Sequence, residues 1–461
     1  MVINLPPYHF PAISRTKIEK KHVMSKYFYN YFAKSEFYRN FVWNKDFSKK
    51  QNMRIGFDAK RAAQNRTGLG NYSRFIIRIL SELRPDNEYH LYTPKPHRIP
   101  YLKEIPTLNQ LFLHFPSKGI WKKLSSLWRI WGISRDIQEN GIDLFHGLSN
   151  ELPLNIGTPE DRKKKYGENR CKYIVTIHDL IFLHTPQYYH WIDRKIYQYK
   201  FRKACQNADR IIAVSEYTKQ EIIDYFHTPK EKIDVVYQGC DPVFSQEIAQ
   251  EKLEEVREKY SLPEEFVLYV GSIEERKNLL LLAKAIALLA KGECRAECLA
   301  ENQRKKEIQV VAVGRHTPYV EEIQSFLKEQ GIEHLFHFYH KVPYEDLPSF
   351  YKLAQIFVYP SRIEGFGIPL LEAISSGVPA IGCTGSCLEE AGGPDSIYVA
   401  PDDAQSMAAT LLNVSSDALL RQNMIMRGRE YAKRFTDEKL LHSLYETYKK
   451  YNHQNNCKKE I

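Results

Sequence analysis

Residues 356–372 read IFVYPSRIEGFGIPLLE, and the interpretation of the whole chain works outward from this stretch. Ile356–Tyr359 is a short apolar run typical of a buried strand, and Leu370–Ser376 has the apolar spacing of a helix. Between them lies a loop with Gly365 and Gly367, and Pro369 stands where the first helical residue is expected. The order strand, glycine loop, helix predicts one corner of a βαβ unit.

The same alternation recurs along the chain. Short β-branched runs are expected to form strands covered on both faces, as in parallel sheets between helices. The runs are Arg54–Ala59, Lys172–Ile177, Arg210–Ser215, Lys232–Tyr237, Phe266–Val270, Ile308–Val313, Ile356–Tyr359 and Val378–Ile381, and helical segments such as Tyr72–Leu83, Asn278–Leu289 and Leu370–Ser376 lie between them. We therefore predict an α/β fold of two Rossmann-like doubly wound domains, with the ligand in the cleft where they face each other.

The domain organisation follows from shifts in composition. Residues 241–263 are rich in Pro and Glu and predict a linker that contains a helix. We expect an extension over 1–52, a first Rossmann-like domain over 53–245, a second over 246–435, and a helix and tail over 436–461. Polar residues 158–170 and 292–306 are interpreted as surface insertions.

The composition of the chain limits where in the cell it is expected and which classes of partner it is expected to bind. The sequence has no apolar stretch of transmembrane length and no signal-like start, so we expect a cytoplasmic protein with its eight cysteines reduced. The net charge is +10, and residues 1–52 hold ten Lys or Arg against three acidic residues. This excess suits a phosphate-rich partner, but no nucleic-acid reader motif is present and we expect no nucleic acid.

The extension leaves two interpretations open. Residues 22–43 contain nine aromatic residues, interleaved with Lys26, Lys34 and Arg39. A helix here either packs on the first domain or lies at a membrane surface as a peripheral contact, with its rings at the headgroup level.

The glycine loop carries the first candidate site. Glu364 and Glu372 flank it, and carboxylates accept hydrogen bonds from vicinal sugar hydroxyls. The glycines allow close approach of the backbone, and the helix N-terminus favours a phosphate. On spacing alone, an ordinary corner with a solvated and a capping glutamate explains the pattern equally well.

Other candidates follow predicted strands. Arg276 and Lys277 could neutralise a diphosphate, or could mark a solvated helix start. Gly68 and Gly70 stand in a loop that could cradle a phosphate, and Ser215 suits a phosphate contact or a helix cap. The remaining candidates, each weighed against a purely structural role, are His178 with Asp179, His146, Asp58 and Arg61.

Together these segments resemble the group 1 retaining glycosyltransferases of GT-B fold, over residues 53–448. The resemblance rests on the Glu364-to-Glu372 motif and on the segments TGLGNY (67–72), TIHDLIFLHTPQYY (176–189), AVSEYTKQEI (213–222), VVYQGCDPVF (235–244), YVGSIEERKN (269–278) and VPYEDLPSFY (342–351). It implies that 53–245 is the acceptor domain and 246–435 the nucleotide-sugar donor domain. It also implies catalytic roles for Glu364, His178, Arg276 and Lys277, and donor contacts at Gly68, Gly70, Ser215, Gly271, Gly365, Phe366, Gly367, Ile368 and Glu372.

The resemblance also implies an activity. The Arg276-Lys277-Asn278 sequence is similar to a subgroup with many mannosyltransferases, so we expect hexose transfer, mannose from GDP-mannose, to a glycan or lipid-linked acceptor. Ser272 and His340 depart from residues common in relatives. Transfer from a UDP-hexose or UDP-N-acetylhexosamine, or donor binding without turnover, remain alternatives. No Asp-x-Asp occurs, so no metal and no cofactor are expected.

Overall fold

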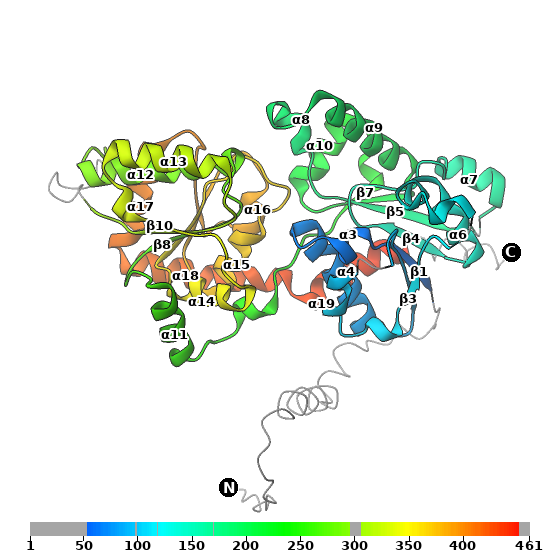
Figure 1. Ribbon diagram of the computed structural model, residues 1–461, viewed down its shortest axis with the longest axis horizontal. Coiled ribbons are helices and arrows are strands. Elements are labelled where there is room, and N and C mark those ends of the chain that lie inside the picture. The colour runs from blue at the N-terminus through cyan, green and yellow to red at the C-terminus, as the bar shows by residue number, and fades with distance from the viewer. Residues whose placement is uncertain (1–52, 97–98, 118, 169, 296–305, 451–461) are drawn as a thin grey trace, which may run out of the picture. The chain divides into compact units, whose positions relative to one another are not determined.

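The computed structural model describes residues 53–96, 99–117, 119–168, 170–295 and 306–450, in which two parallel sheets are each covered by helices (Figure 1). Residues 1–52, on which the interpretation of the extension depends, lie outside this part. Within it, no helix is both long and apolar enough to cross a membrane.

The first sheet has seven strands, and every pairing is parallel. In spatial order they are β3 (Phe112–His114), β2 (Glu88–Tyr92), β1 (Arg54–Asp58), β4 (Leu144–Gly147), β5 (Lys172–Ile177), β6 (Arg210–Ala213) and β7 (Ile233–Val235). The order is that of a doubly wound sheet with one strand added, and it reverses between β1 and β4.

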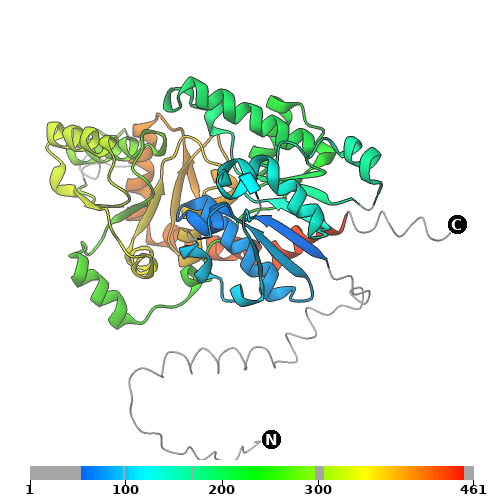
Figure 2. The ribbon, with the colours of Figure 1, turned by 45° about the vertical axis from the view of Figure 1, so that its right-hand side comes forward.

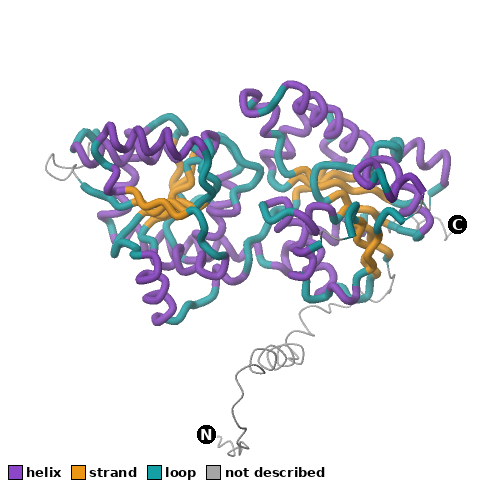
Figure 3. Tube along the Cα trace, viewed as in Figure 1, coloured by secondary structure: helices purple, strands orange, loops and turns teal. Residues whose placement is uncertain are grey.

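Helices cover both faces of this sheet (Figures 1 and 3). One core contains side chains from α3 (Lys60–Gln64) and α4 (Gly68–Leu83). The opposite core contains side chains from α6 (Ile133–Glu139), α8 (Ile181–His184), α9 (Trp191–Asn207) and α10 (Glu216–Phe226). The short helices α5 (Ser125–Leu127) and α7 (Pro159–Tyr166) complete this half.

The second sheet repeats the doubly wound order, again with parallel pairings. Its strands are β10 (Phe336–Tyr339), β9 (Val310–Val313), β8 (Val267–Val270), β11 (Ile356–Tyr359), β12 (Ala380–Cys383) and β13 (Ile397–Val399). Its helices are α11 (Gln250–Tyr260), α12 (Leu279–Lys291), α13 (Pro318–Gln330), α14 (Leu347–Leu353), α15 (Ile368–Ser376), α16 (Leu388–Gly392), α17 (Ala404–Ser416) and α18 (Ala418–Ala432). The order reverses between β8 and β11, so the predicted pair of doubly wound sheets is confirmed.

The last helix, α19 (Asp437–Lys449), returns to the first half of the chain. Leu441, Leu444 and Tyr448 belong to the same apolar core as β1 and α4. The Tyr448 hydroxyl lies 2.7 Å from Nδ1 of His146, which is fully buried at the end of β4. The segment predicted as a terminal helix is therefore part of the first domain's core.

Sequence patterns located some strands to the residue and missed others. β5 and β11 have the predicted bounds, whereas β2, β3, β10 and β13 were not predicted. β2 and β10 contain histidine where β-branched residues were sought, and β3 and β13 have three residues each. β3, β10 and β13 are edge strands, which pair on one side only and need a less continuous apolar pattern, whereas β2 pairs on both sides and was missed for its polar residues alone.

The predicted insertions and linker also contain structure. Within 158–170 lies α7, which begins with a capping box between Thr158 and Asp161. A helix does occur in 241–263, but Val256 of this α11 is buried in the second core. Most of 292–306 lies outside the described residues.

We predict that Tyr448 anchors α19 energetically. Tyr448→Ala should lower the free energy of unfolding by about 3–5 kcal/mol, because it empties a fully buried aromatic site. Tyr448→Phe should cost about 1 kcal/mol, since only one hydrogen bond is lost. Urea unfolding checks both, and an alanine variant as stable as the wild type would show that α19 is not part of this core.

Candidate functional site

The main candidate site lies at the point where the strand order of the second sheet reverses. β8 and β11 are neighbours there, and ligands of doubly wound sheets bind beyond the carboxyl ends of such strands. Arg276 and Lys277 follow β8 in a single 3₁₀ turn, Glu275–Lys277. Ser361 and Glu364 lie in the loop after β11. The topology thus brings together residues that are more than eighty positions apart.

These residues form one ion cluster around the Oε1 atom of Glu364. The Lys277 ammonium and the Arg276 guanidinium both donate to this oxygen, the latter at 3.1 Å, and the Ser361 hydroxyl donates at 2.6 Å. The Tyr359 hydroxyl donates to it at 3.2 Å. Among the described residues every hydrogen bond to this carboxylate falls on Oε1, so Oε2 remains available to a ligand.

The cluster fixes the charge of Glu364. Burial alone would raise the pKa of this carboxyl, but attraction by Lys277 and then Arg276, with hydrogen bonds from Lys277 and Ser361, lowers it to about 2. Burial lowers the pKa of Lys277, and Glu364 opposes that effect. Glu364 is therefore an anion throughout the physiological pH range.

The sequence predicts that Arg276 and Lys277 either neutralise a diphosphate or lie solvated at a helix start, and the solvated alternative is wrong. Lys277 is instead only 8% exposed, and both side chains already contact Glu364. The anion that stabilises two adjacent cations here is part of the protein, because an unpaired ammonium could not be buried at this depth.

The glycine loop is shaped by close packing. Gly365 lies so near the His178 carbonyl that a Cβ would come within 1.8 Å of the oxygen. Its own carbonyl accepts a hydrogen bond from Ser215 Oγ at 2.8 Å. Gly367 has φ of +106° and precedes α15, where Pro369 is the second residue, not the first as predicted. The contact with the His178 carbonyl therefore requires glycine at position 365, independently of any contact with a ligand.

Apolar neighbours support the rest of the loop. Phe366 is buried, with its ring 5.7 Å from that of Tyr237. Ile368 is half-buried as the first residue of α15. After β8, the Gly271 carbonyl lies against Gly314, where a Cβ would come within 1.9 Å. Phe366 and Gly271 therefore have structural roles beside the donor contacts that the resemblance implies.

Glu372 has a different environment from Glu364. It accepts a hydrogen bond from the Tyr351 hydroxyl at 2.8 Å. Burial, with a smaller contribution from Asp241, raises the pKa of this carboxyl to about 7. The two glutamates of the motif therefore differ in charge near neutral pH, one always ionised and the other close to half-protonated.

The His178 side chain is held by the protein. Nε2 lies 2.9 Å from the Leu148 carbonyl, and Nδ1 lies 2.9 Å from Nε2 of Gln238. A carbonyl can only accept, so Nε2 carries the proton and Nδ1 accepts from Gln238. Burial lowers the pKa of the ring to about 4, so it is neutral. In this arrangement neither the ring nitrogens nor the carbonyl beside Gly365 is free, and a direct donor contact would require a local rearrangement.

Asp179, which is half-buried, and Glu221, which is buried, add carboxyls near the ion cluster. Burial raises the pKa of Asp179, while Arg276 and Lys277 oppose the rise. Glu221 of α10 is hydrogen-bonded to Nε2 of His184, and burial raises its pKa to about 8. Sequence reasoning missed Glu221, because no motif marks it and its burial depends on the tertiary structure.

The structure shows the local surroundings of three further sets of candidates. Gly68 and Gly70 belong to the first turn of α4 and not to a loop, and a Cβ on Gly70 would come within 1.9 Å of the Asn65 carbonyl. Ser215 caps α10 by accepting from the Thr218 amide, so the cap interpretation is confirmed. His146 is fully buried between Tyr448 and Thr176, so of its two interpretations the structural role holds.

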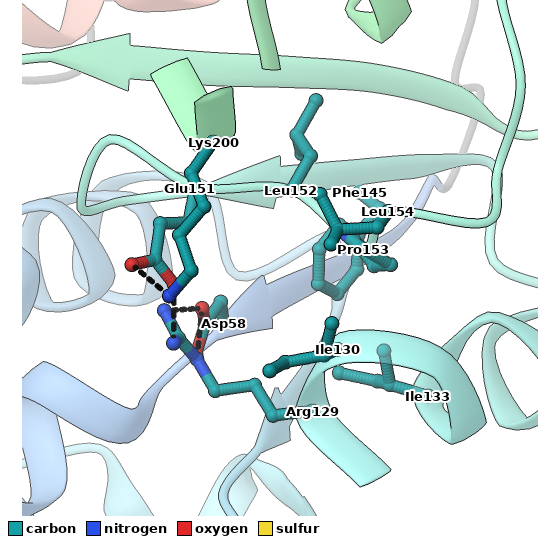
Figure 4. Close-up of a pocket in the computed structure, with 10 residues that line it drawn as sticks. All are labelled: Asp58, Arg129, Ile130, Ile133, Phe145, Glu151, Leu152, Pro153, Leu154 and Lys200. Carbon is teal, nitrogen blue, oxygen red and sulfur yellow. Dashed lines mark hydrogen bonds and ion pairs between the residues drawn. The ribbon is translucent and has the colours of Figure 1, made fainter. Parts of the chain in front are cut away.

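A second group of charges lies at the switch point of the first sheet. Arg129 contacts Asp58 at 2.6 Å and Glu151 at 2.6 Å, and Lys200 contacts Glu151 at 3.3 Å (Figure 4). This charged tetrad borders a small cavity whose other walls are apolar: Ile130, Ile133, Phe145, Leu152, Pro153 and Leu154. Of the four charged residues only Asp58 was a sequence candidate.

No metal site accompanies these groups. The described ranges contain no cluster of three or more potential metal ligands. Six of the eight cysteines fall within them, and all six are free thiols.

Comparison with known proteins gives the family. The model for glycosyl transferases group 1 matches residues 252–431, and the model for glycosyltransferase family 4 matches residues 72–244. O-antigen chain mannosyltransferase B of Escherichia coli is 28% identical over 417 residues, which cover 86% of this chain and 100% of the relative. Serotype-specific mannosyltransferase WbdA of the same species is 28% identical over 285 residues, 60% of this chain but 32% of the relative.

Solved structures agree on the fold. The Anabaena protein Alr3699/HepE, crystallised in complex with UDP, superimposes with a TM-score of 0.64 at 15% identity, covering 87% of this chain and 100% of that one. With both halves matched by family models and two parallel doubly wound sheets in place, the chain belongs to the group 1 glycosyltransferases and has their two-domain GT-B fold.

Proposed function

We propose that this glycosyltransferase moves mannose from GDP-mannose, with retention of configuration and without a metal ion, to a hydroxyl of a growing glycan such as an O-antigen chain. The observation that carries the proposal is the ion cluster of Glu364, Arg276 and Lys277 at the switch point of the second sheet. The choice of mannose is supported by two relatives, an O-antigen chain mannosyltransferase and a serotype-specific mannosyltransferase, and the choice of acceptor by the first of them.

In the proposed donor complex, the diphosphate takes over contacts that Glu364 now makes. Arg276 and Lys277 would turn part of their hydrogen bonding to the phosphate oxygens, where negative charge grows as the sugar leaves. The Oε2 atom of Glu364 would accept a hydrogen bond from a hydroxyl of the sugar. Glu364 thus acts as an internal substitute for the phosphate until the donor arrives.

The proposed transfer proceeds on one face of the sugar. The bond from the anomeric carbon to the phosphate oxygen breaks, a bond to the acceptor oxygen forms on the same side, and the acceptor proton passes to the leaving phosphate. Glu364 is assigned to placement of the sugar, because a carboxylate already holding several donors is a poor nucleophile. Glu372 would accept from the ribose hydroxyls.

The acceptor is assigned to the first half of the chain. The charged tetrad lies beyond the carboxyl end of β1, the position where a doubly wound sheet binds its ligand. Carboxylates beside apolar walls suit a saccharide, which presents hydroxyls at its edge and C–H groups on its faces. The basic, aromatic residues 1–52 remain a proposed peripheral membrane contact.

Variants of the ion cluster test the donor assignment. Lys277→Ala should weaken GDP binding by roughly tenfold or more, because it removes a charge-assisted hydrogen bond. Glu364→Gln should bind GDP as tightly as the wild type or more tightly, since it releases the two cations, yet lose about a hundredfold in turnover. Calorimetry and donor-consumption assays measure both effects, with exposed Lys284→Ala as the matched control. Near wild-type turnover of Glu364→Gln would refute the assignment.

The raised pKa of Glu372 predicts a pH dependence. Affinity for GDP-mannose should increase as the pH rises through about 7, because only the ionised carboxyl can accept from both ribose hydroxyls. Stability of the ligand-free protein should change in the opposite sense. The pKa is higher in the folded state, so this group's contribution is complete below its unfolded pKa and declines as the pH rises towards 7. Glu372→Gln should remove both trends, and titration calorimetry and urea unfolding across this range check them.

A donor panel with and without chelator tests the sugar, the base and the metal. GDP-mannose should be consumed faster than UDP-glucose or UDP-N-acetylglucosamine, and EDTA should leave the rate unchanged. The anomeric configuration of the product, measured by NMR, tests retention. Preference for a UDP-sugar would favour the alternative donor, and metal-reversible loss of activity would contradict the metal-free mechanism.

A further inference from the structure

An unusual amount of apolar surface is exposed on the first half of the chain. More than half of the large apolar side chains that the described residues leave exposed lie on two segments, residues 119–131 and α9. Trp191 is 72% exposed and Ile120 is 63% exposed. We name the set the α9 surface, and its apolar members are Ile120, Leu124, Leu127, Trp131, Trp191, Ile192, Ile196, Tyr197 and Tyr199. Contiguous apolar patches on a soluble protein mark interaction sites.

The two segments adjoin each other. Arg129 and Ile130 from the first, and Lys200 from α9, border the same cavity (Figure 4). The Glu151 carboxylate accepts hydrogen bonds from both Arg129 and Lys200, at 2.6 and 3.3 Å. The two segments therefore approach each other at Arg129 and Lys200.

The architecture of α9 explains why its start is uncovered. Its C-terminal turns are anchored by Phe201, Ala204 and Cys205, which are buried against the first sheet. Its first two turns have no buried residue. Figure 2 shows α9 along the outer side of the helix layer over this sheet, in agreement with Figure 1. The apolar side chains of Trp191, Ile192 and Ile196 are exposed, so they do not stabilise the folded state by burial.

The charge of the α9 surface is strongly biased. The helix holds five basic residues and one acidic residue, and residues 119–131 hold no acidic residue at all. Lys122, Lys123, Lys195 and Arg202 are exposed among the apolar side chains. Of the remaining basic side chains, Arg129 and Lys200 are paired with Glu151.

We propose that the α9 surface docks on an anionic lipid bilayer. Aromatic and aliphatic side chains would enter the boundary between headgroups and acyl chains, while the interleaved cations meet the negative headgroups. This uses folded residues that are distinct from the extension 1–52. The proposal rests on the proposed function only for its consequence, which is the supply of acceptor.

Other occupants fit the surface less well. The extension 1–52 carries ten basic residues against three acidic ones, so it would bring like charges together. A second copy using the same surface in a symmetric dimer would do the same. A glycan would stack on the rings but would gain nothing from Ile120, Leu124, Ile192 or Ile196.

The α9 surface begins near the candidate site, so docking would bring that site close to the membrane. Tyr189, two residues before α9, lies within the electrostatic reach of Asp179 and Arg276. The apolar surface therefore begins close to the candidate site of transfer. A lipid-held acceptor would reach the site without leaving the membrane, which raises its local concentration.

The test compares matched variants of the full chain in vesicle sedimentation. The apolar variant is Trp191→Ser/Ile192→Ser/Ile196→Ser, and its control is Leu419→Ser/Met426→Ser, which removes exposed apolar groups from the second half. The charge variant is Lys195→Gln/Arg202→Gln, with Lys230→Gln/Lys328→Gln as control. The vesicles are phosphatidylglycerol with phosphatidylcholine, or phosphatidylcholine alone, each at low and high salt. Transfer to a water-soluble glycan is measured in parallel.

We expect both α9 variants to bind anionic vesicles roughly tenfold or more weakly than the wild type, whereas the controls bind normally. High salt should abolish the difference made by the charge variant. Transfer to the soluble glycan should be unchanged, so absence of donor consumption in every protein would refute the proposed function and leave the vesicle result intact. Equal vesicle binding by variants and wild type would overturn the proposal, and so would a sedimentation coefficient showing that the apolar variant dissociates a dimer.

Discussion

The Oε1 atom of Glu364 is the point on which the arrangement of the second domain's loops depends. Lysine, arginine, serine and tyrosine side chains from the ends of β8 and β11 converge on that one oxygen. Each of these buried groups would be costly without its partners, since a buried charge is tolerated only when it is paired and hydrogen-bonded. The carboxylate therefore holds two loops in place, and the same loops carry the groups proposed to bind a sugar nucleotide. In that proposal, the atoms that stabilise the loops are also the atoms that contact the ligand.

The switch points explain why both halves place charge at comparable positions. In each sheet the strand order reverses between the first strand and its neighbour on the other side, β1 with β4 and β8 with β11. Loops leaving in opposite directions open a space there, and side chains from both loops fill it. In the second half the space is occupied by the Glu364 cluster, and in the first by the charged tetrad. A common topology thus provides two sites that differ in their side chains.

The sequence predicted the elements whose signals are local and failed where the signal is tertiary. Ile356–Tyr359 and Lys172–Ile177 were located to the residue, because continuous β-branched runs mark central strands. The glycine loop and its two glutamates were found from spacing. No pattern indicated that Lys277 would be buried against Glu364 itself, or that His146 would be closed off by Tyr448, some three hundred residues later. Arg129 and Glu151 were missed for the same reason, since each acquires its role only from the other.

The contact between Gly365 and the His178 carbonyl limits how this protein can change over time. No side chain fits at position 365 while the two backbones lie so close, and the neighbouring Gly367 has a positive φ. Substitution of Gly365 or Gly367 would consequently displace the loop that carries Glu364. A change in donor preference would therefore require substitutions at positions that leave this loop in place. His340, for example, lies outside this loop, directly after β10, and donates to the Gly314 carbonyl at 2.9 Å. In proteins that keep this loop, new specificities would arise by substitution of the residues around it, while the backbone of the loop itself stays unchanged.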